Sequence, residues 1–130
     1  MGEQDVREQS KAEEIRVFLR HLLKDVRAFE QMLEEERFET GVRRIGAEQE
    51  LFLVDKYWRP APIATEVLDA VNDPHFTTEL ARFNLEFNLD PHVFGGSCLR
   101  DMEWQLGELL GKARKAAQSC GGDVVMTGIL

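Results

Sequence analysis

The chain has 130 residues, 43% of them hydrophobic, which suffices for one domain, or part of a larger one, with a real core. Its formal net charge of −8 argues against a nucleic-acid partner, because a phosphate backbone is bound by a basic surface. Neither a membrane protein nor a secreted precursor is expected, since the apolar runs are far shorter than the roughly 18 residues that span a bilayer and the N-terminus is polar.

The first predicted element is a long amphipathic helix from about residue 10 to about Phe38, followed by Gly41 as a plausible stop. Residues 1–41 then form an N-terminal helical extension, and residues 42–130 form a separate part. Packing against the protein's own core is the favoured interpretation, but an a/d spacing also fits a homodimer contact. The spacing is carried by Ile15, Leu19, Leu22, Val26, Phe29 and Leu33.

Two strands are predicted next, from about Arg43 to Asp55 and from about Arg82 to Leu89. A proline-containing loop and a short helix over residues 63–72 separate them. The second strand ends at Asp90-Pro91. Successive side chains on a strand point to opposite faces, so every second residue shares a face.

This alternation places Glu48 and Glu50 on one face of the first strand. On the second strand, it places Phe83, Leu85, Phe87 and Leu89 on an apolar face and sets four polar residues opposite: Asn84, Glu86, Asn88 and Asp90. If the strands share a sheet, one sheet face carries a patch of carboxylates and amides. Oxygen ligands of this kind hold hard cations such as Mg²⁺ or Mn²⁺.

Glu79 lies seven residues before Glu86, an odd offset. On one straight strand the two would point to opposite faces, so a shared site requires Glu79 to lie before the strand or beyond a bulge. A Glu-x-Glu pattern also occurs on the solvated face of an ordinary antiparallel sheet. Taken alone, the residues leave the metal site and the solvated face as open alternatives.

The last predicted elements are a helix from Ser97, a suitable N-cap, to Gly121-Gly122, and a third strand over residues 124–130. Cys98 and Cys120 would lie ~33 Å apart along that helix, too far for a disulfide. Two unpaired cysteines are typical of a reducing cytoplasm, which is the location we expect. The three histidines form no zinc-ligand spacing.

In its ordered motifs the chain resembles the glutamate–cysteine ligase family, in the branch of carboxylate–amine ligases. An apolar-Gly-x-Glu-x-Glu strand is matched by Ile45 to Leu53. An acidic residue, six intervening positions and a Glu-apolar-Asn strand are matched by Glu79 through Asn88. The turn, helix and Gly-containing strand that follow come in the same order, so the resemblance covers roughly residues 42–130.

The resemblance implies an α+β fold: part of a mostly antiparallel, glutamine-synthetase-like sheet with packed helices. By position, Glu48, Glu50, Glu79 and Glu86 would be ligands of Mg²⁺ or Mn²⁺, and Asn88 would hydrogen-bond a ligand or substrate. Such enzymes use ATP to convert a substrate carboxylate to an acyl phosphate, which the amine of a second substrate attacks to give an amide. Glutamate and cysteine would be the substrates and γ-glutamylcysteine the product, a step of glutathione biosynthesis.

The family continues beyond the point where this chain ends, with the residues that hold the ATP phosphates and most of the substrate pocket. We therefore expect residues 42–130 to be the N-terminal portion of a catalytic domain and to be inactive alone. The residues that select the amine lie outside this segment, so the sequence does not identify that substrate. The alternative function is a non-catalytic dimerisation or structural module with a solvated acidic sheet face.

Overall fold

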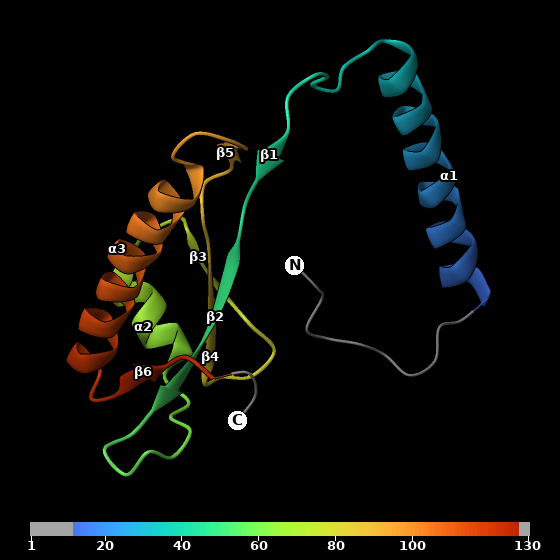
Figure 1. Ribbon diagram of the computed structural model, residues 1–130. Coiled ribbons are helices and arrows are strands. Elements are labelled where there is room, and N and C mark those ends of the chain that lie inside the picture. The colour runs from blue at the N-terminus through green and yellow to red at the C-terminus, as the bar shows by residue number, and fades with distance from the viewer. Residues whose placement is uncertain (1–11, 128–130) are drawn as a thin grey trace. The chain divides into compact units, whose positions relative to one another are not determined.

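The computed structural model describes residues 12–127 (Figure 1). The chain divides into two compact units, residues 1–42 and 43–130, which are described separately here. No helix within residues 12–127 is long and apolar enough to cross a membrane.

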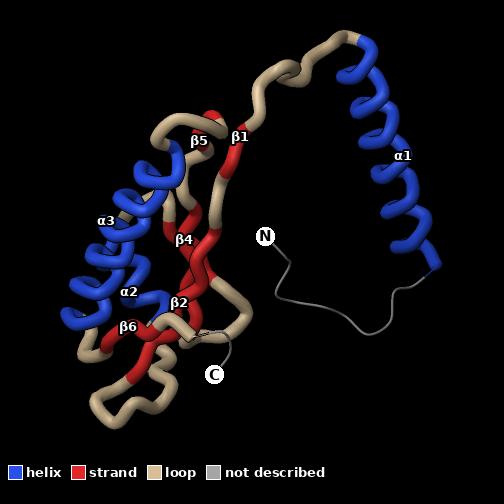
Figure 2. The backbone as a smooth tube through the Cα atoms, viewed as in Figure 1, coloured by secondary structure: helices blue, strands red, loops and turns tan. Residues whose placement is uncertain are grey.

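The described part of the first unit contains one helix, α1 (Ala12–Glu34), which is continuous over its whole length (Figure 2). It ends earlier than the sequence predicts. The chain leaves the helix through Glu36, whose φ is 50°, and the Arg37 amide donates to the Met32 carbonyl at 3.0 Å. These turn contacts end the helix well before Gly41, which lies in the connection to the second unit. Phe38 folds back against Phe29, with ring centroids 5.5 Å apart.

The second unit is an α+β structure with two antiparallel sheets, as the sequence predicts at the level of fold class. The larger sheet has the strand order β3-β4-β2-β6, and β1 pairs with β5 in a small two-stranded sheet. The strands are β1 (Arg44–Ile45), β2 (Glu48–Val54), β3 (Phe76–Thr78), β4 (Asn84–Asn88), β5 (His92–Val93) and β6 (Asp123–Val125).

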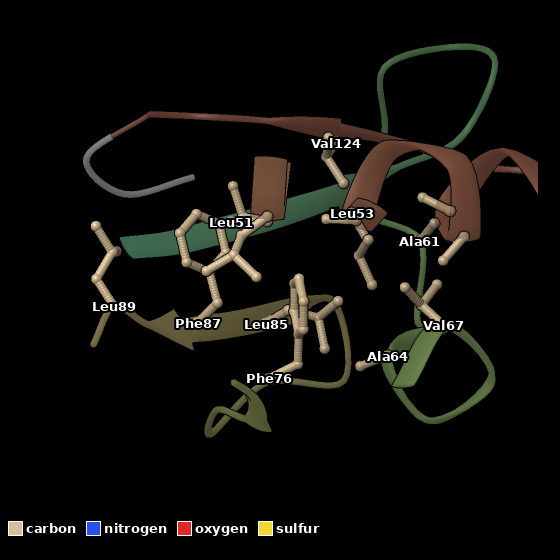
Figure 3. Close-up of a cluster of buried hydrophobic side chains, with 14 residues drawn as sticks. Leu51, Leu53, Ala61, Ala64, Val67, Phe76, Leu85, Phe87, Leu89 and Val124 are labelled. Carbon is tan, nitrogen blue, oxygen red and sulfur yellow. The ribbon is translucent and has the colours of Figure 1, made fainter. Parts of the chain in front are cut away.

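Two helices, α2 (Ala64–Val71) and α3 (Cys98–Ser119), pack against one face of the four-stranded sheet (Figure 1). The core lies between the sheet and the two helices, and Figure 3 shows Leu51, Leu85 and Phe87 pointing into it. These three side chains are completely buried. The strands contribute every second residue to this core, because side chains alternate along a strand.

The strand boundaries differ from the predicted ones in three places. The single predicted strand over residues 43–55 is interrupted after Ile45, so that β1 and β2 have different partners. The short strands β3 and β5 were not predicted. The third predicted strand is β6, which starts at Asp123; residues 128–130 of that prediction lie outside the described residues.

Helix α3 begins and ends where the sequence predicts, but it is not capped as predicted at its start. The Ser97 hydroxyl donates to a carboxylate oxygen of Asp101 at 2.8 Å instead of accepting a backbone N–H. At the other end Gly121 has a φ of 82° and the Gly122 amide donates to the Ala117 carbonyl at 2.9 Å. A Cβ on Gly122 would lie 2.7 Å from Ile63 Cδ1, so this pair of glycines both ends the helix and allows its close approach to the start of α2.

A polar network fastens α3 to the turn before β3. Asp73 accepts hydrogen bonds from Lys112 Nζ at 2.6 Å and contacts His75 Nδ1 at 2.7 Å, while His75 Nε2 lies 3.4 Å from the Asp90 carboxylate. The pKa of Asp73 lies well below its usual range, mainly because of the hydrogen bond from Lys112. The Asp73 carboxylate is likewise the main cause that raises the pKa of His75. Both neighbouring carboxylates favour the protonated form of His75.

We predict that Asp73→Asn lowers the free energy of unfolding by about 1–2 kcal/mol, because it removes charge-assisted hydrogen bonds from a side chain that is only 13% exposed. The loss should be larger near about pH 5.5 than near about pH 8.5. Because the pKa of His75 is raised, its stabilising charge is fully present below pH 6.5 and is lost as the pH rises through the folded-state value. Urea unfolding at both pH values measures the difference. Asp69→Asn, an exposed change in α2, is the matched control; an equal loss at both pH values would contradict the role of His75.

Candidate functional site

The pairing of β2 with β4 places two glutamates directly opposite each other. In this antiparallel register Glu50 faces Glu86, and Glu48 faces Asn88 two pairs along, on the same face. Directly opposed residues on one face of an antiparallel pair have Cβ atoms about 4.5–5.5 Å apart, and like charges in this position repel. The predicted convergence of the two strands on one polar face is therefore present in the structure.

The polar face lies on the side of the sheet opposite the core. Leu51 and Leu85 pair in the core, and the residues next to them in sequence, Glu50 and Glu86, point the other way. On its far side Glu86 is paired with Thr77 of β3, so a hydroxyl adjoins the carboxylates.

The same sheet face becomes apolar toward the end of β2. Phe52 and Val54 are almost fully buried, with 3% and 2% of their surface exposed. The placement of Phe83 on the core face was wrong: it precedes β4, and its ring contributes to this cover, with its centroid 6.2 Å from that of Phe52. The carboxylates therefore lie next to an apolar wall and not on a uniformly solvated surface.

Glu79 reaches this face from the turn that joins β3 to β4. It lies directly after Thr78, before β4, which is one of the two placements that the odd sequence offset requires. Its side chain shares a hydrogen bond with Glu86, which raises the pKa of Glu79. Partial burial and the charges of Glu86 and Glu50 raise that pKa further. A pKa raised by neighbouring carboxylates is a mark of crowded negative charge.

Two asparagines of β4 flank Glu86 on the same face. Asn88 donates from Nδ2 to Glu86 Oε1 at 2.8 Å and so orients that carboxylate. The Oδ1 atom of Asn84 is buried and has no hydrogen-bond partner within the described residues. A buried amide oxygen without a partner is energetically costly.

Two predicted members of the polar face are placed differently from the rest. Glu48 shares the face but lies opposite Asn88, two pairs away from the Glu50–Glu86 pair. The placement of Asp90 on this face was wrong. Asp90 follows the end of β4, and its carboxylate accepts a hydrogen bond from Gln105 of α3 at 2.7 Å, on the core side of the sheet.

The structure thus pairs Glu50 with Glu86 and places Glu79 close enough for its charge to interact with both. Within residues 12–127, however, no three His, Cys, Asp or Glu side chains are converged in the arrangement of a ready-made metal site. The donor chemistry nevertheless fits a hard cation, because all the donors are oxygen atoms and their charge is in excess. The three carboxylates are the residues that would hold Mg²⁺ or Mn²⁺.

Sequence reasoning did not single out Thr77, because β3 is only three residues long and has no period of its own. Its place beside Glu86 follows from the β3–β4 pairing. Asn84 was placed on the polar face, but its buried and unpartnered oxygen depends on tertiary packing that no local pattern encodes.

No protein-family model, curated protein or solved structure matches this chain.

We predict that Glu79→Gln raises the free energy of unfolding at neutral pH by a few tenths of a kcal/mol, a size set by its partial exposure. The folded-state pKa of Glu79 is raised, so stability is lost as the pH rises from its ordinary value of 4.5 through the folded-state value. Glu79→Gln removes this loss of stability at neutral pH. In acid, where the carboxyl group is protonated, the variant should be no more stable than the unaltered chain. Urea unfolding at neutral and acidic pH measures the effect, with Glu48→Gln as the control. Destabilisation by Glu79→Gln at neutral pH would contradict the crowding of charge.

Proposed function

We propose that this chain is the N-terminal part of an ATP-dependent carboxylate–amine ligase, with glutamate and cysteine as its substrates. The observation that carries the proposal is the direct pairing of Glu50 with Glu86, joined by Glu79 from the adjacent turn. These are three of the four carboxylates that the resemblance to glutamate–cysteine ligases assigns to metal ions. A purely solvated face has no need for like charges to be paired in this way.

The carboxylates suit phosphoryl transfer, which depends chiefly on positioning and on neutralisation of charge. Bound Mg²⁺ or Mn²⁺ would supply that neutralisation for the phosphates of ATP. Glu50, Glu79 and Glu86 would bind the cation, and Asn88 would hold Glu86 in place through its 2.8 Å hydrogen bond. The adjoining apolar wall of Phe52 and Val54 would exclude water from one side of the site.

The finer fold assignment belongs to the same proposal. The antiparallel sheet with order β3-β4-β2-β6 and helices on one face is compatible with the edge of a glutamine-synthetase-like sheet. In such a fold the carboxylate face is the one that lines the catalytic funnel. The product would be γ-glutamylcysteine, and we place the reaction in the cytoplasm.

The first test is cation binding by the chain itself. We predict that Mn²⁺ binds and raises the unfolding temperature, because a ligand held only by the folded state stabilises it. Glu86→Gln should remove most of this shift, whereas Glu66→Gln, an exposed change on α2, should leave it intact. Electron paramagnetic resonance of free Mn²⁺, read beside thermal unfolding, measures both quantities. Equal Mn²⁺ binding by the two variants would show that the cation is held elsewhere.

The second test is turnover by the longest natural chain that contains these residues. We predict ADP release with Mg²⁺-ATP and glutamate that depends on cysteine. Glu50→Gln and Glu86→Gln should each lower kcat by roughly a hundredfold or more, because charge neutralisation dominates this chemistry. Preference for ammonia or another amine over cysteine would keep the ligase class and change the substrate. Absence of turnover with every amine, in a folded protein, would remove the ligase proposal.

A non-catalytic dimerisation module is the second candidate, and the exposed apolar face of α1 favours it. Within the first unit, none of the residues of α1 is buried. In that case the acidic sheet face would only be solvated, and neither Mn²⁺ nor Glu86→Gln would alter the unfolding temperature through a bound cation. The Mn²⁺ experiment therefore separates the two functions.

A further inference from the structure

Within the first unit, helix α1 carries an apolar face that runs along its length. The six residues at a and d spacing each expose 44–54% of their surface, and Phe18 and Leu23 beside them expose 62% and 59%. A helix in water derives most of its stability from packing such a face, and intrinsic propensity alone is rarely enough. An apolar face of this extent therefore marks an interaction surface.

The spacing of this face fits a second copy of the same helix in an antiparallel arrangement. In an antiparallel pair, a residues of one helix meet d residues of the other. One register places all three layers of the face in contact at once. The layers pair Ile15 with Leu33 of the second copy, Leu19 with Phe29, and Leu22 with Val26, and each pairing occurs twice by symmetry.

The charges beside the face complement each other in this same register. Arg16 meets Glu30 of the second copy, and the symmetry repeats this attractive contact. The apolar Phe18 meets Met32 on the other flank, also twice. Asp25 meets its own copy once at the centre, so two attractive contacts oppose one repulsive contact.

A parallel pair of the same helices reverses this balance. In a parallel pair, the residue directly before an a position faces a residue of the partner that directly follows a d position. That partner residue has a number higher by five. Asp25 would meet Glu30 of the second copy, and symmetry would make this repulsive contact twice. Arg16 would lose Glu30 as its partner. Charge pairing thus favours the antiparallel orientation.

Nine apolar side chains form this face, and each exposes 39–62% of its surface. The nine are Ile15, Phe18, Leu19, Leu22, Leu23, Val26, Phe29, Met32 and Leu33.

We propose that α1 is a dimerisation helix that pairs with α1 of a second copy of this chain, antiparallel and in the register that joins Arg16 to Glu30. The proposal concerns assembly and does not depend on the chemistry of the carboxylate face. It extends a bare a/d pattern to a defined partner, orientation and register.

Sedimentation equilibrium of the 130-residue chain tests the proposal. We expect a dimer, and we expect Leu22→Glu to produce a folded monomer. Arg16→Glu and Glu30→Arg should each weaken dimerisation roughly tenfold, because two attractive contacts become repulsive. The double variant restores opposite charges and should recover the original affinity to within a few-fold. Lys24→Glu makes the same charge change away from the face and is the control.

The single variants also decide the orientation. In a parallel dimer Glu30→Arg would meet Asp25 of the second copy and would strengthen the association. Strengthening by Glu30→Arg would therefore overturn the proposed orientation. A chain that stays monomeric at high concentration, or a dimer that Leu22→Glu leaves intact, would overturn the role of α1. Circular dichroism of each variant establishes that the helix is retained.

Discussion

The register between β2 and β4 is the constraint on which the rest of the second unit depends. It buries Leu51 against Leu85 on one face and, as a direct consequence, sets Glu50 against Glu86 on the other. A slip by one residue would exchange the two faces and drive the glutamates into the core. Burying one large apolar side chain is worth about 1.5–3 kcal/mol, whereas a like-charged cross-strand pair costs under about 1 kcal/mol. The core therefore fixes the register, and the carboxylate repulsion is tolerated.

This balance explains how a site can be built from mutually repelling groups. The β3–β4 turn adds Glu79 to a face that already carries two opposed carboxylates. The hydrogen bond with Glu86 and the nearby negative charges raise the pKa of Glu79. Asn88 restrains Glu86, while the Asp73–Lys112 contact anchors the turn before β3 to α3. The side chains that would bind a cation are thus positioned by elements whose stability comes from elsewhere.

The elements with strong periods were predictable from the sequence, and those defined by a partner were not. Alternation predicted strands over residues 48–54 and 84–88 and the polar face that they share, and Ser97 with Gly121-Gly122 predicted the bounds of α3. The two short strands β3 and β5 owe their existence to pairing with β4 and β1, which no local pattern encodes. Asp90 was misplaced for a related reason: the alternation stops where the strand stops, and Gln105 then determines where the carboxylate lies.

The two units of the chain are stabilised by different means, and this difference carries a functional argument. The second unit buries its own apolar residues between the sheet and two helices, whereas within the first unit α1 buries none. A segment that served only as a tether would need no apolar face, and a polar sequence would avoid the risk of aggregation. Three core layers and two symmetric charge contacts, all satisfied in one antiparallel register, are more than a tether requires. The proposed assembly and the proposed chemistry thus belong to different units of the chain.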